Sequence, residues 1–137
     1  MMGRKTVPLV VLILAGCAST TPVDISSAST QLEMRQIQTR QYDTLDKALT
    51  MRSVIATLQD LGFTIDQADA ELGTVTATRF HEYTMRMTVT VVRRGEERVS
   101  VRANARIGEN AVTDAATYQD FFVALDKAMF LTLQKVD

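Results

Sequence analysis

The clearest pattern in the chain is an alternation of apolar and polar residues between positions 83 and 107. Two runs, each with an apolar side chain at every second position, flank the polar segment Arg94-Gly95-Glu96-Glu97. The apolar positions are Tyr83, Met85, Met87, Val89 and Val91 in the first run, and Val99, Val101, Ala103, Ala105 and Ile107 in the second. Successive side chains of a strand point to opposite faces, so the pattern predicts an antiparallel pair with one apolar and one polar face.

Two other segments have the three- and four-residue spacing of amphipathic helices. The first is capped by Asp43 or Thr44 and ends at Gly62, and the second begins at Thr113 or Asp114 and runs nearly to the C-terminus. The apolar stripes are Ala48, Met51, Val54, Ile55, Leu58 and Leu61 in the first, and Tyr118, Phe121, Phe122, Leu125, Met129 and Leu133 in the second. Each stripe predicts a helix that buries one side.

Three shorter segments complete the predicted sheet. Residues 36–42 are rich in β-formers, and residues 63–68 and 74–80 flank the turn Glu71-Leu72-Gly73. The expected order is therefore strand, helix, four strands, helix. An antiparallel sheet with two helices packed on its single apolar face satisfies both patterns. We therefore predict an α+β fold in one domain, residues 36–137.

The N-terminal segment has a pattern of a different kind. The basic pair Arg4 and Lys5 precedes an apolar run over residues 7–14. This run is far shorter than the roughly 18 residues that a membrane-spanning helix needs. The order is typical of a secretory signal peptide, which we place at residues 1–16.

The four residues Leu14-Ala15-Gly16-Cys17 resemble the bacterial lipobox. The resemblance implies that the signal is cut before Cys17 and that this cysteine is lipidated, so that its acyl chains anchor the protein in a membrane. Ala18 and Ser19 stand where an aspartate would signal retention in the inner membrane, which favours the outer membrane. The alternative is an ordinary signal peptide in which the cysteine occurs by chance.

Residues 17–35 are predicted to be the lipidated cysteine and a flexible tether. Seven of the thirteen residues from 18 to 30 are serine or threonine, with Pro22 and two large aliphatic side chains among the rest. Such a segment cannot bury a hydrophobic core.

Composition narrows the chemistry. A single cysteine excludes a disulfide framework, and with one histidine it leaves no Cys/His cluster for zinc. Without Arg4 and Lys5 the chain carries 13 basic and 16 acidic side chains, so we expect no nucleic-acid partner. We expect neither a metal nor a cofactor.

The candidate catalytic groups are few. His81 and Glu82 lie between two predicted strands, and no second histidine exists to complete a metal site or a relay. Asp66, Asp69 and Glu71 lack the spacing of a calcium loop and are interpreted as a solvated turn. No G-x-S-x-G motif occurs, and the acidic residues fall in turns and on helix surfaces. We therefore expect that the protein is not an enzyme.

The charge distribution suggests a binding surface. Between Arg79 and Arg106 there are seven arginines against three glutamates. On the alternation above, Arg86, Arg102 and Arg106 share the polar face of the sheet with threonine, serine and asparagine. Guanidinium groups bind carboxylates and phosphates bidentately, so this face is a candidate site for a partner. The alternative is a solvated face whose residues serve strand propensity and resist aggregation.

Four segments together are similar to a group of small proteobacterial lipoproteins without an assigned activity: residues 38–44, 58–63, 72–73 and 118–122. The similarity covers most of residues 36–135. The predicted order of elements also resembles the helix-grip domains of the BamC lipoprotein, an accessory component of the β-barrel assembly machinery. These resemblances imply a fold and a tether, and no catalytic residues.

We therefore expect a non-enzymatic accessory or scaffold protein of the cell envelope. It is anchored in the outer membrane by its N-terminal acyl chains, faces the periplasm and contacts an envelope protein. The alternative is a carrier that holds a lipid or a small apolar ligand in a pocket between helices and sheet. The residues that would line this pocket, or else simply fill the core, are Met51, Met85, Met87, Met129, Phe121 and Phe122.

Overall fold

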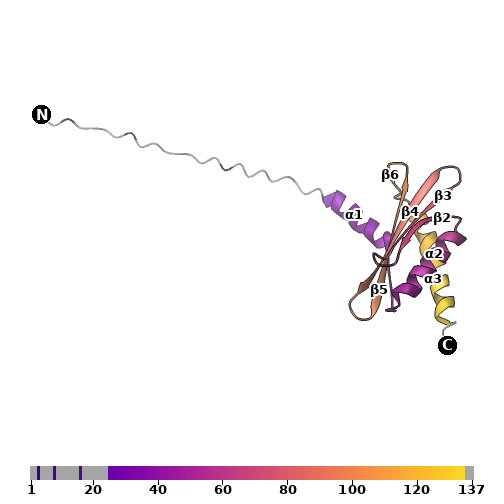
Figure 1. The fold of residues 1–137 in the computed structure, drawn as a ribbon. Coiled ribbons are helices and arrows are strands. Elements are labelled where there is room, and N and C mark those ends of the chain that lie inside the picture. The colour runs from indigo at the N-terminus through magenta and orange to yellow at the C-terminus, as the bar shows by residue number, and fades with distance from the viewer. Residues whose placement is uncertain (1–2, 4–7, 9–15, 17–24, 135–137) are drawn as a thin grey trace.

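The computed structural model describes residues 25–134 and the isolated residues 3, 8 and 16 (Figure 1). Most of the predicted signal peptide, Cys17 and the first part of the predicted tether lie outside the described residues.

The described chain forms one antiparallel sheet and three helices, which confirms the predicted α+β class. In chain order the elements are α1 (Ile25–Gln38), β1 (Thr39–Tyr42), α2 (Lys47–Asp60), β2 (Thr64–Asp69), β3 (Thr74–Phe80), β4 (Thr84–Arg94), β5 (Arg98–Ile107), β6 (Asn110–Ala111) and α3 (Ala115–Gln134). The strand order in the sheet is β1-β5-β4-β3-β2, and β6 pairs with β5. The long β4–β5 hairpin, predicted from its alternation, forms the centre of the sheet.

The structure corrects the predicted order at the N-terminal end. The sequence predicted a tether up to residue 35 and a strand from Gln36, whereas α1 occupies residues 25–38 and β1 begins at Thr39. The residues from Gln31 to Gln36 are good helix formers, and Met34 and Ile37 pack against the core. Tertiary packing thus stabilises a helix in a segment that was interpreted from its serine and threonine content alone.

Two smaller corrections concern the ends of elements. The N-cap of α2 is Asp46, whose carboxylate accepts a hydrogen bond from the Leu49 amide at 2.9 Å, and not Asp43 or Thr44. A two-residue strand, β6, follows the turn at Gly108 and was not predicted. The predicted end of α2 is confirmed, because Gly62 follows the C-cap with a φ of 85°.

Helices α2 and α3 lie side by side on one face of the sheet (Figure 1). The core lies between them and the inward residues of β3, β4 and β5. Large and small side chains alternate across the central hairpin, with Met87 opposite Ala105 and Val89 opposite Ala103. The small alanines leave room for the aromatic rings of α3, and Phe121 and Phe122 meet edge to face at 5.1 Å.

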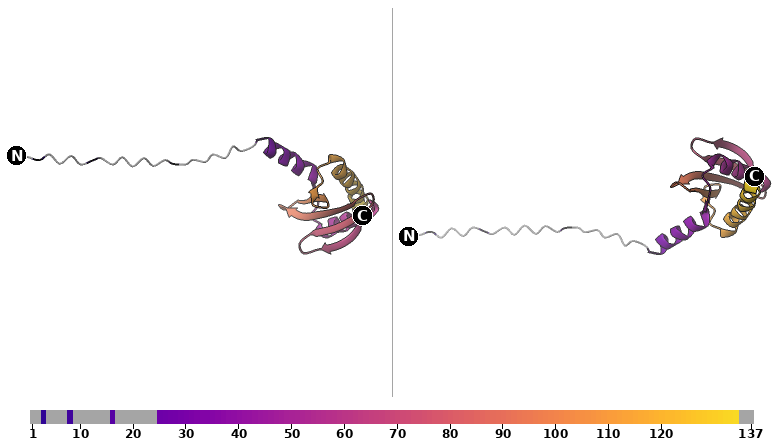
Figure 2. Two further views of the ribbon diagram at one scale, coloured as in Figure 1. Left: turned by 90° about the horizontal axis from the view of Figure 1, so that it is seen from above. Right: turned by 90° about the horizontal axis from the view of Figure 1, so that it is seen from below.

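The end of α1 is fixed by a buried tyrosine on α3. The Tyr118 hydroxyl donates a hydrogen bond to the Val112 carbonyl at 2.6 Å and accepts one from the Ala105 amide at 3.2 Å. The side-chain amide of Gln38, the last residue of α1, also donates to this hydroxyl. β1 and β6 pair with two separate parts of the same edge of β5, and these hydrogen bonds lie between them. They also attach the end of α1 to the sheet. The other end of α1 points away from the domain, as both views in Figure 2 show.

Candidate docking face

The face of the sheet that α2 and α3 do not cover is polar, and we call it the open face. The structure places Arg86, Arg102 and Arg106 on it, exposed, as the alternation predicted. Its remaining residues on the central hairpin are Thr84, Thr88, Thr90, Val92 and Arg94 on β4, and Arg98, Ser100 and Asn104 on β5. Five of the seven arginines between Arg79 and Arg106 therefore lie on one side of the sheet.

Like charges stand directly opposite each other twice on this face. Arg86 pairs in register with Arg106, and Arg94 with Arg98. Direct cross-strand pairs of like charge destabilise a sheet. Acidic side chains relieve only one member of each pair: Glu109 lies 3.9 Å from Arg106, and Asp43 lies 3.0 Å from Arg98. Both of these ion pairs are well exposed, so each contributes little to stability.

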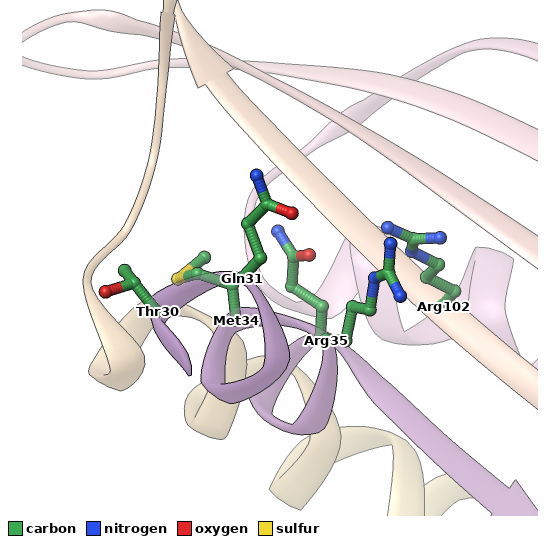
Figure 3. A pocket seen from close by; sticks show the side chains of 6 residues that line it. Thr30, Gln31, Met34, Arg35 and Arg102 are labelled. Atoms are coloured by element: carbon green, nitrogen blue, oxygen red, sulfur yellow. The ribbon is translucent and has the colours of Figure 1, made fainter. Parts of the chain in front are cut away.

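Helix α1 adds an arginine that the sequence reasoning missed. Arg35 and Arg102 extend toward one another from α1 and β5 (Figure 3). A hollow of about 290 Å³ lies beside them, lined also by Gln31 and Gln38 of the helix. A second hollow of about 340 Å³ is lined by Arg35, Arg102, Arg94 and a polar floor of Thr39, Thr90, Ser100 and Asn104. The two hollows share Arg35 and Arg102.

Four of these arginines have no acidic partner in the part of the chain that the structure describes. Within residues 25–134, Arg35, Arg86, Arg94 and Arg102 form no ion pair. Guanidinium groups cannot lose their charge at ordinary pH, so the repulsion persists unless an anion binds. The flanking hydroxyl and amide groups can donate hydrogen bonds to the same anion. The open face therefore suits a ligand or partner that carries carboxylate or phosphate groups.

The sequence contains a pattern from which Arg35 could have been assigned to the domain. The stretch from Gln31 to Gln36 favours a helix, which would have placed this arginine in the domain. Arg94 was assigned to the turn of the hairpin, whereas β4 extends to include it. Arg35 could not be placed beside Arg102 from sequence alone, because α1 and β5 are far apart in the chain.

At the margin of the covered face, one arginine belongs to a network of paired polar groups. Arg40 pairs with Asp126 of α3 and lies 5.1 Å from the ring of Phe122. The Tyr42 hydroxyl donates to the same carboxylate at 2.7 Å. Burial, the hydrogen bond to Asp126 and the charge of that carboxylate raise the pKa of Tyr42 well above its ordinary value, while Arg40 acts in the other direction. Here a cation, a carboxylate and a phenol form a satisfied network.

The other candidate groups lie in or beside turns, except Asp66, which was predicted in a turn but lies on β2 and accepts a hydrogen bond from the Thr78 hydroxyl. His81 is exposed at the tip of the β3–β4 hairpin, where its Nδ1 accepts a hydrogen bond from the Glu82 amide at 2.8 Å. Asp69 accepts hydrogen bonds from the amides of Glu71 and Leu72, so it stabilises the β2–β3 turn. Over the described residues, no three histidine, cysteine, aspartate or glutamate side chains gather in a way that could hold a metal ion.

The methionines and phenylalanines proposed as a pocket lining are packed together. Met51, Met85, Met87, Met129, Phe121 and Phe122 are between 0% and 6% exposed and belong to one core cluster. Side chains therefore fill the space between the helices and the sheet at these positions.

Comparison with known proteins adds no family. No family model matches the chain, and no match was found among curated proteins. In the part of the chain that the structure describes, no helix is both long and apolar enough to cross a membrane.

Proposed function

We propose that this protein is a lipoprotein of the outer membrane that faces the periplasm and acts as a non-enzymatic accessory or scaffold protein. Its open face docks an envelope partner that presents carboxylate or phosphate groups. The observation that carries the proposal is the group of four arginines, Arg35, Arg86, Arg94 and Arg102, which have no acidic partner within residues 25–134.

Electrostatics supports this proposal over a merely solvated sheet. Strand propensity and solubility are served equally well by threonine and by charges of mixed sign. Neither requirement explains why Arg86 faces Arg106 and Arg94 faces Arg98, since such pairs destabilise the sheet. An anionic partner would turn this repulsion into attraction and would also speed association.

The anchor is supported by the sequence Leu14-Ala15-Gly16-Cys17 and is tested separately from the docking face. Cells fed a labelled fatty acid should incorporate label into the wild-type chain and none into a Cys17→Ser variant. The variant should also leave the membrane fraction or accumulate uncleaved. A wild-type chain that takes up no label would overturn the lipid anchor.

The docking face is tested by capture from envelope extracts. Replacing Arg86, Arg102 and Arg106 by glutamine should abolish capture of the partner, and added salt should weaken capture by the wild type because exposed charges are screened. The matched control carries Gln59→Glu, Gln119→Glu and Lys127→Gln, at exposed positions on α2 and α3, and changes the net charge equally. If both triple variants capture the partner as well as the wild type does, the open face is not the docking site.

A further inference from the structure

A groove separates α2 from the edge strand β2 on the helix side of the sheet, and we call it the edge groove. Its volume is about 460 Å³, within the range of small-molecule sites. Its apolar lining consists of Ala48, Met51 and Ile55 from α2, with Ala68 and Ala70 from the β2–β3 hairpin. This site is distinct from the open face, which lies on the other side of the sheet.

The groove stays open because its walls carry small side chains. Three of the five apolar lining residues are alanines, and two of them, Ala68 and Ala70, lie at the uncovered edge of the sheet. Larger side chains at these positions would fill the space between helix and strand, as they do in the core. The exposed apolar surface that results is characteristic of ligand grooves.

Three cations stand at the rim. Lys47, Arg52 and Arg93 line the groove, and among the described residues no acidic side chain does. The Lys47 ammonium donates a hydrogen bond to the Glu71 carbonyl, a neutral group, at 3.2 Å. Within residues 25–134, none of the three cations forms an ion pair. The groove therefore combines an apolar floor with an uncompensated positive rim.

The apolar path continues past two of these cations. A neighbouring hollow of about 410 Å³ is lined by Lys47 and Arg93 together with Leu72, Val91 and Val92. Leu72 and Val92 are exposed. The two hollows share Lys47 and Arg93, so apolar surface lies on both sides of these cations. Val92 in the second hollow belongs to the open face.

We propose that the edge groove binds an anionic amphiphile with a single alkyl chain, the chain lying on Met51, Ile55 and Ala68 and the anionic group meeting Arg52, Arg93 and Lys47. An alkyl chain has no hydrogen-bonding groups and so matches the alanine, methionine and isoleucine side chains of the floor, which offer none. A peptide laid on the same floor would bring backbone N–H and C=O groups against apolar side chains, which is costly without partners. The inference does not depend on the proposed docking function.

The first test measures ligand binding at residues that line the groove. The full chain carrying Cys17→Ser is titrated with dodecanoate, kept below the concentration at which it forms micelles, while methyl NMR signals are recorded. The signals of Met51 and Ile55 should shift and saturate, and that of the buried Met87 should not. Dodecyl maltoside, a neutral amphiphile with the same chain, should bind about tenfold more weakly because it cannot pair with the cations.

Two alanines on one helix provide the matched variants. Ala48 and Ala56 are both exposed on α2, but only Ala48 lines the groove. Ala48→Leu should fill the groove and weaken dodecanoate binding about tenfold or more, whereas Ala56→Leu should change it less than about twofold. Leucine is well tolerated in helices, so both variants should fold.

Four outcomes would contradict the proposal. Equal weakening by the two leucine variants would mean that dodecanoate binds elsewhere, and equal affinity for the two amphiphiles would remove the role of the cations. Absence of any saturable shift at Met51 and Ile55 would overturn the site. If a peptide rather than an amphiphile occupied the groove, an acidic peptide would shift these signals and dodecanoate would not.

Discussion

The two faces of the sheet are built from alternate residues of the same strands, but they differ in burial and in the charges that they carry. On the covered face, every inward residue of the central hairpin from Met85 to Val91 and from Val99 to Ala105 is buried under α2 and α3. At its margin Arg40 and Tyr42 both bind Asp126, whereas Lys47, Arg52 and Arg93 form no ion pair within residues 25–134. On the open face, arginines stand opposite arginines and most lack an acidic partner within residues 25–134.

This difference distinguishes residues that stabilise the fold from residues that contribute little to its stability. Truncating a packed side chain leaves a cavity, so the covered face is constrained by stability. Exposed charges are screened by water and can be exchanged with little effect on stability. The proposed anionic partner would account for the repeated arginines of the open face.

The largest effect should come from the centre of the covered face. Phe121 is fully buried, and Phe121→Ala should lower the free energy of unfolding by about 3–5 kcal/mol, a large part of the total for a small domain. Urea denaturation followed by circular dichroism measures this change. A midpoint equal to that of the wild type would mean that the apolar stripe of α3 does not form the core.

Removing one hydroxyl at the margin should have the next largest effect. Tyr118→Phe takes away the donor to the Val112 carbonyl and the acceptor for the Ala105 amide, and leaves these buried groups without a partner. The expected loss is about 1–3 kcal/mol in the same denaturation assay. Amide hydrogen exchange at Ala105 should accelerate, and unchanged protection there would argue against the proposed link between α1, α3 and β5.

The third prediction uses pH. The pKa of Tyr42 is raised in the folded state, so above about pH 10 the unfolded state loses the phenolic proton first. The contribution of this group to stability is complete below that pH and is lost as pH rises further. Tyr42→Phe should therefore be less stable than the wild type near neutral pH, and the difference should shrink above about pH 10. A difference that is constant from pH 8 to 11 would contradict the half-buried Tyr42–Asp126 hydrogen bond.

The smallest effect on stability is expected on the open face. Replacing Arg86, Arg102 and Arg106 by glutamine should change the free energy of unfolding by no more than about 0.5 kcal/mol per residue. Because Arg86 and Arg106 repel each other, the sign should be toward greater stability at low salt. Marked destabilisation in the denaturation assay would show that these arginines serve the fold.

The sequence predicted those parts of the molecule where periodicity is strong. The alternation from Tyr83 to Ile107 placed the central hairpin and the three arginines on its polar face, and the stripe around Phe121 placed α3. These patterns are local, and burial on one face enforces them. Composition used without periodicity gave a wrong prediction at the N-terminal end. The serine- and threonine-rich segment was predicted to be a tether, so α1 and the position of Arg35 on it were missed.

Long-range proximity could not be predicted in the same way. Arg35 reaches Arg102 only because Gln38 and Met34 dock α1 against the rest of the domain. The edge groove likewise depends on how α2 crosses a strand that follows it in the chain, and no short motif encodes the gap between Ala48 and Ala68. Such sites arise from packing between elements.

Site-specific photo-cross-linking in intact cells tests most directly whether the open face docks an anionic partner. A photoreactive residue at Thr88, in the middle of the open face, is compared with one at Val123, exposed on α3. We predict a discrete adduct from Thr88 that disappears when Arg86, Arg102 and Arg106 are replaced by glutamine, and no matching adduct from Val123. An adduct from Val123 alone, or one from Thr88 that survives the loss of all three arginines, would contradict the proposed docking.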